Sequence, residues 1–311
     1  MEADTTLDQN WLAAALDRLA EQPLCGYRAG DRPWTEPTAL AALALLAHHR
    51  IDDAWPALKW LEYQLDDQHG VGMNIDQREP GWPTGLAVLA WRYAISMQAP
   101  AAAEFAPTIE RAVRAILSWS GEALEPNEFV AHDCTLVGWS WIDQTHSWVE
   151  PTAIQVLALQ SLPPQDRAAF AGLAMRRDEA IRLLWDRQLP HGGWNYGNTL
   201  VLGQELRPHL LPTGMVLLAL AGENDSAARA EASLRYLSRE LGAQASPVSL
   251  AYGLLALTAH GRRPAAADWW LQVAATRCLR KSPAPLSLSL MALAALSNAD
   301  CFVSLSVGSQ P

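Results

Sequence analysis

The sequence predicts an all-α protein, an (α/α)6 toroid in which six inner helices are surrounded by six outer ones. Half of the 311 residues are hydrophobic, and Ala and Leu are the commonest of them, a composition that favours helices. A short motif led by proline recurs six times, and an apolar run rich in Ala and Leu follows each copy. Amphipathic segments alternate with these runs, as expected for a ring of helical hairpins.

The six proline-led copies predict the inner helices. Proline suits the first turn of a helix, where its missing N–H would have no partner, and it disfavours helical geometry in the residue before it. We therefore expect helices to begin within about three residues of each proline, all on one rim of the toroid. The prolines are Pro37, Pro83, Pro151, Pro212, Pro247 and Pro285. The runs at 41–47 and 215–220 are apolar on every side, which indicates helices covered all round.

The segments between these runs predict the outer helices. Ile109, Val113 and Ile116, for example, form an apolar stripe. The charged residues Glu110, Arg111 and Arg114 lie between them. The outer helices are expected near 10–21, 54–66, 107–119, 174–188, 226–241 and 265–280. Residues 1–311 then make one domain, whose longest loops, 67–82, 121–147 and 190–210, lead into the proline ends of inner helices. Function is expected on that rim, because long loops commonly carry it.

Charge and composition exclude some partners. The formal net charge is −10, which repels the phosphates of nucleic acids. The polar, acidic start of the chain does not resemble a secretory signal, so the expected location is the cytoplasm. No apolar run reaches the roughly 18 residues of a membrane span, which leaves peripheral membrane contact or a protein partner open. Four cysteines without Cys-x-x-Cys spacing read as free thiols.

One motif carries a resemblance to a known family. The segment Gln188-Leu-Pro-His-Gly-Gly-Trp194 resembles the Gln…Gly-x-Trp repeat of squalene-hopene and related terpenoid cyclases, in which it ties outer helices together. A second copy, at Gln64 and Gly70-x-Gly72, lacks the tryptophan. Together with the proline-led helices, the whole chain resembles a single toroid of the terpenoid cyclase and protein prenyltransferase superfamily. The resemblance implies a structural role for Trp194 and an apolar or isoprenoid ligand in the lumen.

The chain departs from the signatures of that superfamily. It has no Asp-x-Asp-Asp string, the general acid of many cyclases, and contains only pairs such as Asp52-Asp53. Asp133 and Cys134 are adjacent, whereas prenyltransferases bind zinc through Asp-x-Cys. The histidines and acidic residues of the rim loops match no compact zinc pattern, so we expect no cofactor, although zinc or magnesium is not excluded.

Four titratable residues are the candidate catalytic groups. Glu36 and Glu150 each stand one residue before an inner-helix proline. Both should therefore face the same mouth, which is the opening of the toroid at the proline rim. The alternative is that each carboxylate caps its helix, where the dipole would lower its pKa. Asp133 and His146, in the long rim loop, complete the set, and Asp133 is the preferred acid or base because no helix proline marks it as a cap. All four are expected to converge on one pocket.

Aromatic side chains near the rim are the candidate substrate-binding residues, because their faces attract apolar groups and cations. They are Trp34, Trp82, Trp139, Trp141, Trp148 and Tyr196. The alternative for each of them is packing between repeats.

Three functions follow from these patterns. The first is an isoprenoid cyclase or transferase, with a lumen lined by Leu40, Leu43, Val88, Leu157, Leu217, Leu254 and Leu290. The second is a carbohydrate-active (α/α)6 enzyme with paired carboxylates and stacking tryptophans. The third is a non-catalytic toroid that binds a lipid or a protein. An apolar tunnel would favour the first, an open polar groove the second and a filled centre the third.

Overall fold

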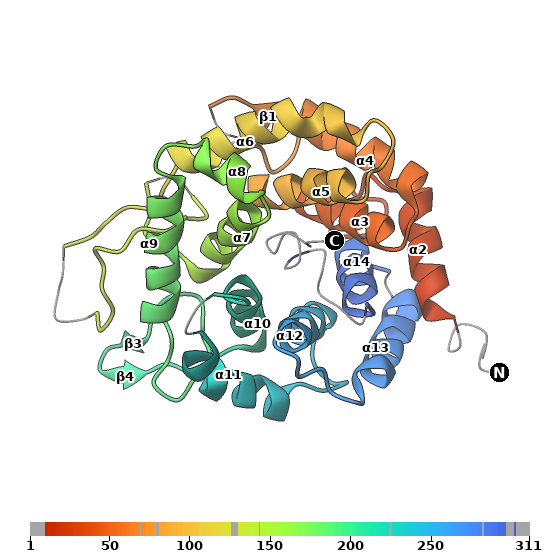
Figure 1. Ribbon diagram of the computed structural model, residues 1–311. Coiled ribbons are helices and arrows are strands. Elements are labelled where there is room, and N and C mark those ends of the chain that lie inside the picture. Colours follow the sequence, from red (N-terminus) through yellow and green to blue (C-terminus); the bar gives the residue numbers. More distant parts are fainter. Residues whose placement is uncertain are drawn as a thin grey trace.

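The computed structural model describes residues 10–68, 70–78, 81–125, 130–142, 144–223, 226–281, 283–296 and 302, and these residues are mostly helical (Figure 1). Within these ranges the chain forms 13 α-helices and one 3-10 helix. The sheet in this part of the chain is limited to two antiparallel hairpins, β1 (Leu65–Asp66) with β2 (Gly70–Val71) and β3 (Leu200–Val201) with β4 (Gln204–Glu205).

The six proline-led helices are confirmed, and each begins within two residues of its proline. They are α3 (Thr35–Ala47), α5 (Thr84–Ser96), α7 (Val149–Gln160), α10 (Leu210–Ala219), α12 (Pro247–Ala259) and α14 (Pro285–Ala294). Along the chain each contacts the next, and α14 contacts α3, so the order of contacts is cyclic.

The other six expected helices alternate with these along the chain and surround them in Figure 1. They are α2 (Trp11–Glu21), α4 (Ile51–Tyr63), α6 (Ala106–Ser118), α9 (Leu173–Asp186), α11 (Ser226–Glu240) and α13 (Ala267–Lys281). The sequence did not predict two short segments, η1 (Ala102–Phe105) and α8 (Pro164–Ala168).

Burial separates the two sets of helices. Every residue of α7 is buried, whereas α6 buries a stripe that includes Ile109, Val113 and Ile116. On the exposed face of α6, Arg114 pairs with Glu110 at 2.6 Å. The runs at 41–47 and 215–220 are likewise buried throughout, as their composition predicted.

The prediction of an open lumen is wrong at the positions expected to line it. Six of the seven residues have no exposed surface, and the seventh, Leu157, is 2% exposed. A side chain facing an empty or hydrated tunnel would keep surface accessible to water. These leucines and Val88 instead belong to one core cluster of buried residues that also contains Phe302.

The threonine after the proline fixes the loop that precedes each of the first four inner helices. Its hydroxyl accepts a hydrogen bond from a backbone N–H of the loop and donates to the carbonyl oxygen of the same residue. The pairs are Thr38 with Cys25, Thr84 with Val71, Thr152 with Trp139 and Thr213 with Trp194, at 2.8–3.5 Å. The four loop residues are therefore equivalent, and Val71, rather than Gly72, occupies the tryptophan position in the second copy.

Candidate active site at the rim

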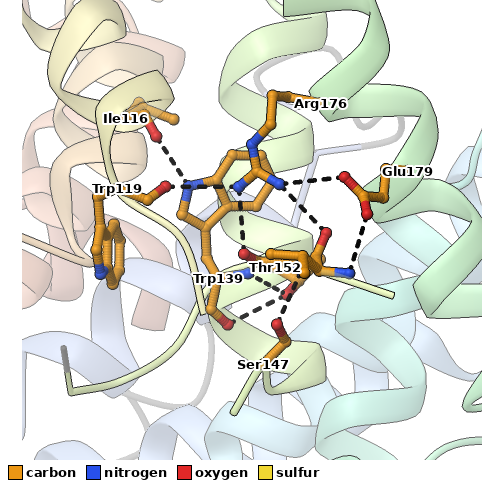
Figure 2. A network of polar contacts seen from close by, with 9 residues as sticks. Ile116, Trp119, Trp139, Ser147, Thr152, Arg176 and Glu179 are labelled. Atoms are coloured by element: carbon orange, nitrogen blue, oxygen red, sulfur yellow. Dashed lines mark hydrogen bonds and ion pairs between the residues drawn. The ribbon is translucent and has the colours of Figure 1, made fainter. Parts of the chain in front are cut away.

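Arg176 of α9 anchors the long loop that leads into α7 (Figure 2). Its guanidinium donates to the carbonyl oxygens of Trp119, Val137 and Gly138 at 3.3–3.5 Å. It also lies 4.7 Å from the ring centre of Trp139, a distance at which a cation is attracted to an aromatic face. The loop is thus bound to the outer helix by several contacts at once.

Trp139 belongs to this anchor and offers no surface to a ligand. Its side chain has no exposed surface, and its indole N–H donates to the carbonyl oxygen of Ile116 at 2.9 Å. The equivalent Trp194 is also fully buried and donates to the carbonyl of Leu184. The structural role expected for Trp194 therefore extends to Trp139, and the prediction of substrate binding by Trp139 is wrong.

The residues just before the inner-helix prolines are equivalent in the first four repeats, because the threonine contacts hold the four loops alike. They are Glu36, Trp82, Glu150 and Leu211. In the cyclic order of contacts α5 lies between α3 and α7, so Trp82 comes between the two glutamates. The repeat itself therefore places one carboxyl group on each side of Trp82.

The two glutamates share one environment. Glu150 is 8% exposed, and burial, followed by the charge of Glu36, raises its pKa to about 7. Burial also raises the pKa of Glu36, although the hydroxyl of Tyr27 donates to its Oε2 at 2.6 Å and acts in the opposite direction. Each carboxyl thus favours its neutral form more than a carboxyl in water does.

The capping alternative predicted the opposite direction for both pKa values. Among the described residues, Glu36 has one hydrogen-bond partner, the hydroxyl of Tyr27, and no described hydrogen bond reaches Glu150. The cost of burying charge therefore outweighs any effect of the helix ends. A carboxyl whose pKa is close to 7 can both donate and accept a proton near neutrality.

Aromatic rings lie beside the carboxyl pair. Tyr27 packs edge-on against Trp34 at 5.5 Å, and Trp82 packs edge-on against Trp141 at 4.6 Å. Trp34 and Trp141 are partly exposed, so they offer faces to a ligand, whereas most of Trp82 is covered. The amide of Gln155 donates to the carbonyl oxygen of Trp82, and its own Oε1 is buried without a partner among the described residues.

Trp148 and Tyr196, the other two predicted aromatic residues, contact histidines. Trp148 is partly exposed and lies 4.6 Å from the ring of His146. Tyr196 is 47% exposed and lies 5.3 Å from the ring of His209. Both remain accessible at the rim. No described contact joins either ring to Glu36 or Glu150.

The four predicted catalytic residues do not share one pocket. Asp133 is exposed, and its Oδ1 accepts hydrogen bonds from the N–H and the hydroxyl of Thr135 at 2.9 and 2.6 Å. These bonds lower its pKa, so Asp133 is a poor acid near neutrality. His146 instead lines a separate cavity of 140 Å³ that contains neither glutamate. The expected convergence is therefore wrong, because the long loop turns Asp133 towards solvent.

One residue that the sequence analysis missed, Tyr27, has a usable signal in the repeat. Tyr27 lies two places after Cys25, as Trp141 and Tyr196 lie two places after the tryptophans equivalent to Cys25. Aligning the repeats would have placed its side chain at the mouth. Gln155 carries no such signal, because its hydrogen bond joins α7 to the loop before α5.

The described residues also bear on metal binding and on membrane insertion. They contain no group of three His, Cys, Asp or Glu side chains arranged to hold a metal ion. None of their helices is both long and apolar enough to cross a membrane.

Comparisons with known proteins give information about the fold alone. No protein-family model matches the chain, and no curated protein matches it. A crystal structure of a protein from Actinoplanes is similar, with a TM-score of 0.50 and 18% sequence identity, over 86% of this chain and 80% of that one. At this identity the similarity supports a shared helical fold and carries no function.

Proposed function

We propose that this protein is an (α/α)6 toroid similar to terpenoid cyclases and prenyltransferases, and that it converts an apolar isoprenoid at the mouth formed around Glu36 and Glu150. The cyclic contacts of the six proline-led helices support the toroid. The observation that carries the reaction is the buried Glu150 carboxyl, whose pKa is raised to about 7 by burial and then by the charge of Glu36.

Glu150 is suited to start such a reaction by protonation. Its neutral carboxyl would transfer a proton to a carbon–carbon double bond, leaving a carbocation on the substrate and a carboxylate on Glu150. The electron-rich faces of Trp34 and Trp141 would stabilise the cation, and a carboxylate would later remove a proton to form the product. Each step conserves charge and requires no group beyond these side chains.

The filled centre limits where the substrate binds. The leucines beneath the mouth leave no water-sized space, so an isoprenoid would lie across the aromatic rim above them. A carboxylate at this point would repel a diphosphate, and Glu150 is partly ionised near its pKa of about 7. A neutral hydrocarbon is therefore the preferred substrate class.

The test measures binding and turnover together. Thermal shift with a neutral C30 hydrocarbon, a polyprenyl diphosphate with and without magnesium, and an oligosaccharide would rank the ligand classes, and mass spectrometry would detect products. Glu150→Gln should abolish turnover while retaining binding, whereas Glu205→Gln, on the exposed hairpin, should change neither. Full turnover in Glu150→Gln, or no response to any isoprenoid, would overturn the proposal.

A carbohydrate-active enzyme is the second candidate. The same filled centre favours it, because a sugar needs only surface tryptophans for stacking and a carboxyl pair for acid–base chemistry. Stabilisation by the oligosaccharide alone, with loss of hydrolysis in both Glu36→Gln and Glu150→Gln, would favour this function.

A further inference from the structure

A separate cavity of 140 Å³ is lined in large part by the long rim loop. Its polar lining includes His132, Cys134, His146, Arg187 and Asn198. These residues come from the rim loop, the end of α9 and the loop after Trp194, so three separate segments build the cavity. Neither Glu36 nor Glu150 lines this cavity.

Arg187 supplies a fixed positive charge to this cavity. It is 4% exposed, and its Nη1 donates to the carbonyl oxygen of Asp133 at 3.1 Å and to the carboxylate of Asp186. Burial lowers its pKa, but a guanidinium keeps its proton in proteins. A buried cation of this kind, held at a cavity wall, is suited to an anionic ligand.

The nearby carboxylates already have donors. Asp186 accepts from Arg187 and from the N–H of Asp133 at 3.0 Å, and the Asp133 side chain accepts twice from Thr135. Glu122 is the one carboxylate among the described lining residues, and it is exposed. The described lining of the cavity therefore lacks the cluster of free carboxylates that would favour a metal ion.

Two imidazoles lie within the field of Arg187. The pKa of His132 is lowered to about 4, first by burial and then by the charges of Arg187 and His146, and Asp133 opposes this only in part. The pKa of His146 is lowered by burial and then by Arg187. The Nδ1 atom of His132 is buried and has no partner among the described residues. Burial and the charge of Arg187 thus disfavour protonation of both rings, and the charge of Asp133 offsets this only in part at His132.

We propose that this cavity binds a small oxyanion, free or as the terminal group of a larger molecule, held by Arg187, His132 and His146. The volume fits this class, because a water molecule occupies about 30 Å³ and the cavity admits only a few such volumes. An anion would give the unpartnered imidazole a charged acceptor and would stabilise the protonated form of both rings. The site does not depend on the proposed isoprenoid chemistry, because it uses different residues.

Histidine NMR titration tests the proposal directly. In the presence of sulfate, whose charge is constant near neutrality, the pKa values of His132 and His146 should rise by about one pH unit. The exposed His191 is the internal control and should not change. Unchanged pKa values for His132 and His146, or an equal rise for His191, would overturn the proposal.

Variants separate this site from general salt effects. Arg187→Gln should remove the response of both histidines, whereas Arg182→Gln, on the exposed face of α9, should leave it unchanged. If Arg187→Gln does not fold, His132→Gln in the folded protein should weaken sulfate binding about tenfold, the usual order for one charged hydrogen bond. Unaltered binding in His132→Gln would count against the site.

Comparing inorganic phosphate with glycerol phosphate distinguishes the source of the oxyanion. Tighter binding of the ester would assign the site to the end group of a larger molecule, and equal binding would assign it to the free ion. Failure of both to bind would exclude the site. Because none of these measurements involves an isoprenoid, their result is separate from the test of Glu150.

Discussion

Replacing Glu150 with Gln should change how the stability of the protein depends on pH. In the folded protein burial raises the pKa of Glu150 from 4.5 to about 7. As pH rises from about 4.5 to 7, the unfolded chain therefore loses this proton first, while the folded protein keeps it. The stability contributed by Glu150 is fully present below the unfolded pKa and is lost as pH rises through the folded pKa.

The size of the effect follows from the two pKa values. Their difference corresponds to roughly 3 kcal/mol, at about 1.4 kcal/mol per pH unit. A glutamine does not ionise, so Glu150→Gln should lose this pH dependence. Relative to wild type, the free energy of unfolding of the variant should be higher at about pH 8 than at about pH 4 by roughly 3 kcal/mol.

Urea unfolding of both proteins at the two pH values measures this difference. Comparing pH values cancels any constant cost of placing an amide at this position, and Glu205→Gln controls for the loss of an exposed carboxylate. An equal effect of Glu150→Gln at both pH values would refute the reasoning, because the carboxyl would then titrate alike in folded and unfolded chains.

Other substitutions test the contacts that hold the loops. Thr152→Val should destabilise the protein by about 2 kcal/mol in urea unfolding, because it leaves the buried N–H of Trp139 without an acceptor; Thr145→Val, at the surface, should cost less than about 0.5 kcal/mol. Trp139→Phe should cost about 2–3 kcal/mol through the lost indole hydrogen bond and the smaller ring, and a neutral result would contradict the anchoring role. Gly193→Ala should be more destabilising than Gly203→Ala in thermal unfolding: both have positive φ, but only at Gly193 would the added Cβ meet other atoms, the nearest at 2.6 Å. Equal melting temperatures for the two alanine variants would refute the crowding at Gly193.

The helices could be predicted because their signals are local. A proline acts on its own turn and on the residue before it, so each inner helix began where its proline predicted. The repeat also fixed the equivalence of Glu36 and Glu150, because both occupy the same place before the proline. The cyclic contacts then brought the two into one electrostatic environment.

Other properties depended on the tertiary structure. Trp139 and Trp141 are two residues apart in a loop, yet one is fully covered and the other offers a face, since the Arg176 anchor covers only the first. The sequence determined which residue types stand at the rim. Only the folded chain decided that Asp133 turns outwards, that the seven apolar residues expected to line a lumen are buried, and that Glu150 holds a proton near pH 7. Each of these three properties depends on how far neighbouring segments exclude water from a side chain. The segments that do so come from residues far apart in the chain.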